Sequence, residues 1–115
     1  MNTNVIIILK VLQNKTVSFI IQGNALPTFL LSDSSTVHSQ ISDYLKNYFN
    51  IMSSWLDIRF VNLEVIDKEL YIFYSSFVPK EYLNESNITL TNDVSQFDSE
   101  IQQSIQQSLR LSPYK

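Results

Sequence analysis

The side chains between Leu26 and Ile51 that could bind a divalent cation are Asp33 and Asp43. Magnesium prefers oxygen ligands, usually from carboxylates and phosphates, and a bound cation can activate water for attack on a phosphoanhydride. That chemistry requires several carboxylates to converge on one point. Two isolated acids do not meet the requirement. We interpret Asp43 as a solvated residue on a helix and Asp33 as a turn or capping residue.

Most other reaction chemistries lack the residues that they need. The chain has no cysteine, one glycine and one histidine, His38, which excludes thiolate catalysis, histidine-based triads and glycine-rich phosphate loops. Further carboxylates surround the second predicted hairpin and its exit: Glu64, Asp67, Glu69, Glu81 and Glu85. Solvation of the hairpin is the simpler interpretation. A divergent hydrolase that takes metal ligands from Glu64, Glu69 or Glu81 is the alternative.

Two pairs of apolar, β-branched segments predict two hairpins. Residues 4–12 and 16–22 are separated by Gln13-Asn14-Lys15, and residues 56–66 and 70–78 by Asp67-Lys68-Glu69. Short polar breaks between such segments are typical of hairpin turns. The nearly continuous apolar character of the first pair indicates strands that are covered on both faces. A further short strand is expected at residues 88–91.

Helical periodicity appears twice. Apolar side chains spaced three and four residues apart trace one face of a helix over residues 36–49, with a polar cluster before it that can cap its start. The same four-residue step at Ile101, Ile105 and Leu109 predicts a second helix over residues 98–111, stopped by Pro113. The length predicts a single domain spanning residues 1–115.

The segment from Leu26 to Ile51 resembles the Nudix box. Leu26-Pro27 matches the Leu-Pro pair at which that box begins, an amphipathic helix follows, and Ile51 stands at the closing aliphatic position. The order of strands and helices along the chain is also similar to that of the Nudix fold. The resemblance implies an α/β (α+β) fold in which a mixed sheet is packed between two helices.

The box positions that would carry the family's chemistry hold other residues. The family places glycines, an Arg-Glu pair and further glutamates where this chain has Thr28, Phe29, Ser35, Asp43, Tyr44, Asn47 and Tyr48. The resemblance implies that these positions serve metal-dependent hydrolysis in intact members. A neutral phenol is a poor magnesium ligand, so Tyr44 and Tyr48 do not replace carboxylates. We expect no catalytic residue, no metal and no cofactor.

The aromatic residues of the second hairpin predict a surface for a protein partner. The candidate interface residues are Tyr71, Phe73 and Phe77 in this hairpin and Trp55 just before it. For Trp55 a position in the core is the default interpretation, and an interface is the alternative. A base-stacking role is the alternative, but the net charge of −3 and the absence of a basic run argue against nucleic acid. The apolar run at residues 5–9 is too short to span a bilayer and lacks the features of a leader peptide. We expect no membrane contact.

These observations predict a catalytically inactive Nudix-like domain that acts as a protein–protein interaction module or structural subunit of a larger assembly. A nucleotide-binding sensor without hydrolysis is the alternative. The abundance of Asn, Ile and Ser beside a single glycine is typical of AT-rich coding, which is common in phages. We expect a location in the cytoplasm or in a virion, and attribute the glycosylation sequons at Asn84 and Asn87 to chance.

Overall fold

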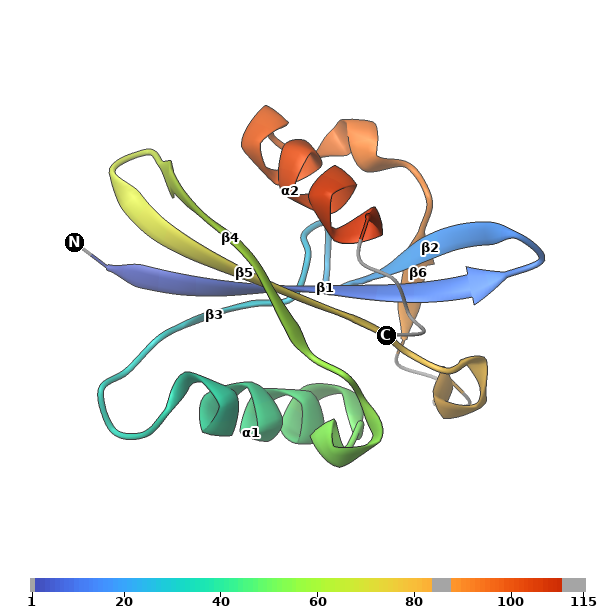
Figure 1. The fold of residues 1–115 in the computed structure, drawn as a ribbon, viewed down its shortest axis with the longest axis horizontal. Coiled ribbons are helices and arrows are strands. Elements are labelled where there is room, and N and C mark those ends of the chain that lie inside the picture. The colour runs from blue at the N-terminus through green and yellow to red at the C-terminus, as the bar shows by residue number, and fades with distance from the viewer. Residues whose placement is uncertain (1, 84–87, 111–115) are drawn as a thin grey trace.

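The computed structural model describes residues 2–83 and 88–110, in which a mixed β-sheet lies between two helices (Figure 1). The strands are β1 (Thr3–Gln13), β2 (Thr16–Ile21), β3 (Thr28–Leu30), β4 (Arg59–Ile66), β5 (Glu69–Phe77) and β6 (Thr89–Thr91). The helices are α1 (Val37–Phe49) and α2 (Ser99–Leu109), with 3-10 turns at Ser53–Trp55, Lys80–Leu83 and Val94–Gln96. The strand order is β4-β5-β1-β2-β6, and β3 also pairs with β1.

Strand β1 is the centre of the sheet because it pairs along both edges. One edge runs parallel to β5, from the pair Thr3–Leu70 to the pair Lys10–Phe77. The other edge pairs antiparallel with β3 near the start of β1 and with β2 near its end. Residues 5–9 are at most 2% exposed. This burial on both faces explains the continuous apolar run in the sequence.

The structure confirms the two predicted hairpins, and a tight turn joins the two strands of each. The β1–β2 turn has positive φ at Asn14 (49°) and Lys15 (68°), and the β4–β5 turn at Asp67 (52°) and Lys68 (69°). Positive φ at both central residues gives a two-residue turn the twist that its flanking strands require. The chain's glycine, Gly23, has φ 65° and lies in a third turn.

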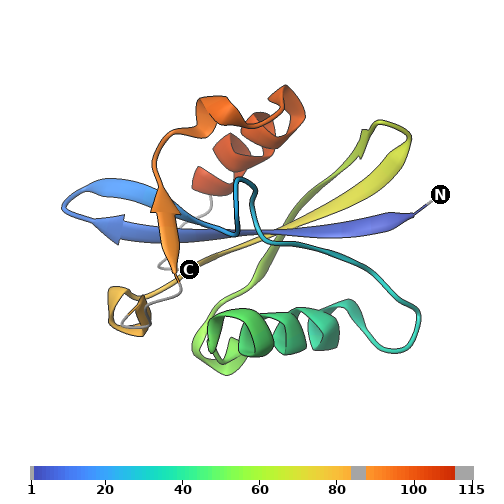
Figure 2. The ribbon, with the colours of Figure 1, turned by 180° about the vertical axis from the view of Figure 1, so that it is seen from behind.

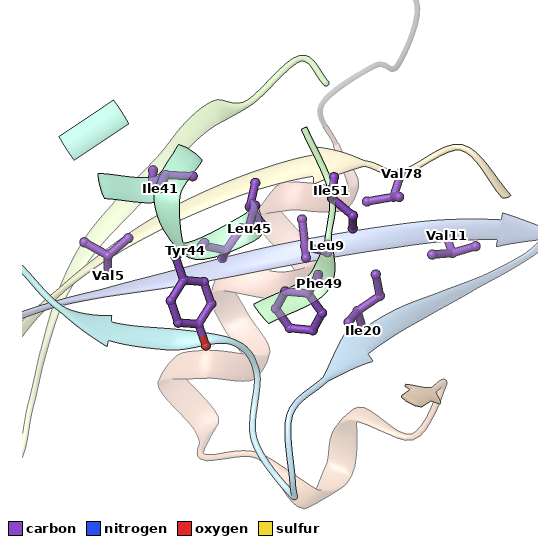
Figure 3. Packing of buried hydrophobic residues seen from close by; sticks show 11 residues of the cluster. Val5, Leu9, Val11, Ile20, Ile41, Tyr44, Leu45, Phe49, Ile51 and Val78 are labelled. Carbon is purple, nitrogen blue, oxygen red and sulfur yellow. The ribbon is translucent and has the colours of Figure 1, made fainter. Parts of the chain in front are cut away.

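The two helices cover opposite faces of the sheet (Figures 1 and 2). Alternate side chains of β1 point to opposite faces, and each set joins a separate core cluster. The cluster under α1 combines odd-numbered β1 residues with apolar helix residues, among them Val5, Ile7, Leu9, Ile41, Leu45 and Phe49 (Figure 3). The cluster under α2 includes Ile6, Ile8, Phe73, Phe97 and Ile105.

The structure differs from the sequence prediction at two places. Strand β4 begins at Arg59 instead of residue 56, because residues 53–55 form a 3-10 turn that ends at Leu56. Strand β3, which pairs with Asn4, Val5 and Ile6 of β1, was not expected. The two sequons and Glu85 involve residues 84–87, which lie outside the described residues. Within the described chain, no helix is long and apolar enough to cross a membrane.

Candidate functional site at the box helix

Helix α1 has well-defined ends that follow from its sequence. The Oγ1 atom of Thr36 accepts a hydrogen bond from the backbone N–H of Ser39 at 3.1 Å, so Thr36 is the N-cap. At the other end Asn50 adopts a left-handed conformation with φ 56°, and its N–H donates to the carbonyl of Lys46. Asparagine tolerates this conformation better than most residues. The helix is therefore fixed at both termini.

The loop before α1 is held by a side-chain amide. The Nε2 atom of Gln40 donates to the carbonyls of Ser32 (2.7 Å) and Ser35 (2.9 Å), and the backbone N–H of Ser32 donates to Oε1 of Gln40 (3.0 Å). Ser35, which stands at the box's first glutamate position, has an exposed side chain. Internal hydrogen bonds thus order a loop whose side chains offer few ligands to a cation.

Three aromatic rings occupy the box region in a continuous stack. The Phe29 and Tyr44 ring centroids are 5.2 Å apart, and those of Tyr44 and Tyr48 are 4.7 Å apart. The Tyr44 hydroxyl donates to Oε1 of Gln22. Burial raises the pKa of Tyr44 above its ordinary value, although hydrogen bonds involving Thr28 and Gln22 oppose the shift. The phenol therefore stays neutral at physiological pH and is a poor cation ligand.

The polar side chains at the box positions are exposed and do not join this stack. Asp43 and Asn47 are exposed on α1, and Asp33 is exposed in the loop before it. His38 is exposed on the helix, with its ring edge-on to Tyr74 at 5.5 Å. In residues 2–83 and 88–110, no three His, Cys, Asp or Glu side chains group closely enough to hold a metal ion.

Two of the carboxylates around the second hairpin, Glu69 and Glu81, lie far apart. Glu69 opens β5 and accepts a hydrogen bond from Nδ2 of Asn4 at 2.7 Å. Glu81 lies beyond the other end of the same strand. At roughly 3.3 Å per residue, the strand separates these two carboxylates by about 30 Å. Glu69 and Glu81 therefore do not share a cation site.

The four candidate interface residues have different surroundings. Trp55 is 49% exposed, and its ring lies 4.6 Å from that of Tyr82. Tyr71 and Phe77 are half-buried. Phe73 is fully buried under α2, so its assignment to a partner surface was wrong. Phe73 points to the face of the sheet that α2 covers, where it packs with Phe97 and Ile105.

A buried polar group beneath α2 was missed at the sequence level. Lys10 is 1% exposed, its Nζ atom donates to the Ser108 carbonyl at 2.6 Å, and it lies 4.3 Å from the Phe77 ring centroid. Burial, followed by the nearby Arg59 guanidinium, lowers the pKa of Lys10 to about 8. A lysine at an inward-facing position of an apolar strand was the signal in the sequence. Its partner lies 98 residues away.

Solved structures of other proteins have a similar architecture. No protein-family model and no curated protein matches the sequence. A mutT/nudix family protein from Listeria innocua aligns over 79% of this chain and 78% of its own, with 10% identity and a TM-score of 0.63. The Ap4A hydrolase of C. elegans aligns over 93% and 95% of the two chains, with 10% identity and a TM-score of 0.65.

A third solved structure, Shewanella oneidensis NrtR, has 11% identity and a TM-score of 0.73. That alignment covers 94% of this chain but 62% of NrtR. At these identities the similarity shows the fold alone. The chain has a Nudix-like α/β fold, with a mixed six-stranded sheet and two helices. The resemblance drawn from the box sequence is thereby confirmed at the level of the fold.

Proposed function

We propose that this protein is a catalytically inactive Nudix-like domain that serves as an interaction or structural subunit of a larger assembly, such as that of a phage. The observation that carries the proposal is the replacement of box carboxylates by an aromatic stack. Tyr44 and Tyr48 project from α1, and the Tyr44 ring lies between those of Phe29 and Tyr48. This arrangement keeps the fold of a nucleotide hydrolase without its cation ligands.

Electrostatics supports this proposal. Hydrolysis of a phosphoanhydride develops negative charge, which the enzymes of this reaction class neutralise with divalent cations or with Arg and Lys side chains. Near the stack, the charged side chains of α1 are Asp43 and Lys46, both exposed. A single exposed carboxylate and a single exposed ammonium provide neither a cation site nor a phosphate clamp.

A hydrolysis assay tests the proposed inactivity. The purified chain is incubated with a panel of nucleoside diphosphate derivatives in Mg²⁺ or Mn²⁺, and the nucleoside monophosphate formed is measured by chromatography. We expect no turnover above a protein-free blank. Cation-dependent turnover that Asp43→Ala abolishes would contradict the proposal. Asp98→Ala is the matched control, since this exposed carboxylate begins α2 without a side-chain capping bond.

A nucleotide-binding sensor is the second candidate function, and the exposed end of the stack favours it. Tyr48 is 58% exposed while its neighbour Tyr44 is buried, so the outer ring face could stack with a base. Calorimetry with a nucleotide panel separates this candidate from the first. Binding heat that Tyr48→Ala removes and Asn47→Ala retains would support the sensor. No heat for any nucleotide would eliminate it.

A further inference from the structure

The outer edge of β4 is not covered by another strand. In the described chain β4 pairs with β5 alone and ends the sheet. Figure 1 looks onto this side of the molecule, and no other segment passes in front of β4. The unpaired N–H and C=O groups of an edge strand are a template for pairing with another strand. The backbone groups on the outer edge of β4 can therefore form hydrogen bonds with another strand.

The side chains of β4 make this edge apolar. Phe60, Leu63 and Val65 are 53%, 55% and 61% exposed. Edge strands usually carry charges or proline, or are very short, which prevents association. The strand at the opposite end of the sheet, β6, follows that pattern, since it has three residues with the sequence Thr-Leu-Thr. Strand β4 has eight residues and no proline, and its two charged residues, Arg59 and Glu64, are of opposite sign.

A β-bulge sorts the side chains of β4 onto two faces. The register with β5 shifts between Phe60 and Asn62, so one extra residue, Val61, interrupts the alternation. As a result Phe60 and Leu63 lie on the face that α1 covers elsewhere. Arg59 and Glu64 lie on the face of α2. The α1 side of the strand is therefore apolar, while the α2 side combines these two charged residues with Val61 and Ile66, which pack in the cluster under α2.

The order of these residues is self-complementary. In an antiparallel pair of β4 strands with a two-fold axis between Val61 and Asn62, Phe60 stands opposite Leu63 of the second copy. Arg59 then stands opposite Glu64 of the second copy, and the symmetry repeats both pairs. Cross-strand apolar and opposite-charge pairs each stabilise such a ladder. Arg59 keeps its 2.7 Å ion pair with Asp57 of the same copy, and the match with Glu64 is one of opposite charges across the two strands.

We propose that β4 is a self-association surface that joins two copies of this chain into one continuous sheet through antiparallel β4–β4 pairing. The charge pattern selects a second copy over an unrelated strand, because the Arg59–Glu64 match arises from the strand's own sequence. The interaction concerns a surface separate from the box helix. The proposed β4–β4 pairing is independent of whether the chain hydrolyses nucleotides.

The size of the contact predicts a dimer that exchanges with monomer. In this register residues 59–64 of the two copies pair, and six residues at roughly 3.3 Å each give a ladder about 20 Å long. Such a strip is smaller than the ~1,200–2,000 Å² buried in stable interfaces. We therefore expect a dissociation constant in the range of about 1–100 µM, with isologous two-fold symmetry.

Sedimentation velocity over a concentration series tests the dimer. The wild-type chain is expected to change from monomer to dimer between about 1 µM and about 1 mM. Leu63→Lys is expected to weaken association at least ~10-fold, because it brings two ammonium groups into the ladder. Leu30→Lys is the matched control: Leu30 is 59% exposed on β3, and its replacement should leave the dimer unchanged. Circular dichroism verifies that both variants fold.

Charge reversal tests the register. Glu64→Arg alone places like charges opposite each other and is expected to weaken the dimer, while Arg59→Glu combined with Glu64→Arg restores it. Three outcomes would overturn the proposal: a monomer at every concentration, a dimer that tolerates Leu63→Lys and Phe60→Lys, or a double variant that fails to restore association. The expected monomer–dimer curve with rescue by the double variant would establish it.

Discussion

The two faces of the sheet are covered by helices that use different interactions. Helix α1 buries Ile41, Leu45 and Phe49 against an apolar cluster. Helix α2 contributes one fully buried apolar residue, Ile105, and beside it buries the hydroxyls of Ser104 and Ser108. The first contact gains stability from the hydrophobic effect, which is not directional. The second depends on hydrogen bonds that require a particular geometry.

The polar interface of α2 involves several strands. Lys10 of β1 donates to the Ser108 carbonyl. The Oγ atom of Ser104 donates to Oδ1 of Asn62 at 3.1 Å, and Nδ2 of Asn62 donates to Oε1 of Gln107. A buried hydrogen bond adds about 0.5–1.5 kcal/mol net, while an unsatisfied buried group costs about 1–3 kcal/mol. This interface therefore specifies the position of α2 more than it stabilises the fold.

The largest expected effect comes from removing apolar contact beneath α1. Leu45→Ala deletes a fully buried side chain and is expected to lower the free energy of unfolding by about 2–5 kcal/mol. Urea denaturation followed by circular dichroism measures it. The control is Leu109→Ala on α2, whose side chain is 44% exposed. Equal losses in the two variants would break the proposed contrast between the faces.

The next effect is a pH dependence that originates beneath α2. The pKa of Lys10 is lowered to about 8 by burial, so between about pH 8 and pH 10 the unfolded chain binds more protons than the folded one. The free energy of unfolding should therefore rise with pH over this window, by on the order of 1–3 kcal/mol. Above about pH 10 the raised pKa of Tyr44 acts in the opposite direction.

Lys10→Met isolates this contribution because it removes the titrating group and keeps a side chain of similar shape. Stability measured by urea titration at successive pH values should lose its rise between about pH 8 and pH 10 in this variant. Lys46→Met, which changes an exposed lysine of α1, should retain it. A wild-type stability that is flat over this window would show that the Lys10 ammonium is not penalised by burial.

A smaller effect on stability is expected when the hydrogen bonds between β4 and α2 are removed. Asn62→Ala removes both hydrogen bonds from β4 to α2 and leaves Ser104 without that partner. We expect a loss of about 1–2 kcal/mol. Hydrogen exchange should accelerate in the amides of α2 and remain unchanged in α1, because local opening follows local contacts. Asn47→Ala, at an exposed position of α1, should change neither helix.

The smallest effect concerns the start of α1. Thr36→Ala removes the N-cap bond to Ser39 and is expected to cost about 1 kcal/mol in thermal or urea unfolding. Ser35→Ala, one residue earlier at an exposed side chain, should cost less than about 0.5 kcal/mol. An equal cost for both would mean that the loop, and not the cap, fixes the beginning of the helix.

The sequence predicted those parts of the fold that depend on local periodicity. The helix over residues 36–49 and both hairpins follow from spacing and turn residues, and the structure confirms them. The parallel pairing of β1 with β5 links residues 67 positions apart, such as Thr3 and Leu70, and no local pattern encodes it. The burial of Phe73 depends on this pairing and on α2, so its exposure was assigned wrongly.

The candidate site shows the same division between local and distant information. The absence of carboxylates at Tyr44 and Tyr48 was evident from the residue types. Two contacts at the site depend on the tertiary placement of β3 and the following loop beside α1. They are the ring contact of Tyr44 with Phe29 and the hydrogen bond from Gln40 to the loop. The role of Lys10 depends on a carbonyl 98 residues away. Tertiary contacts of this kind are not encoded in any short window of sequence.

The position of β1 at the middle of the sheet has a consequence for how the chain folds during synthesis. Its longest edge pairs with β5, up to the pair Lys10–Phe77, so that edge stays open until the second hairpin has been made. Pairings between distant segments close slowly, and an apolar strand waiting for its partner is exposed to aggregation. Ribosome-bound intermediates that end before β5 should therefore depend on chaperones that shield residues 5–9.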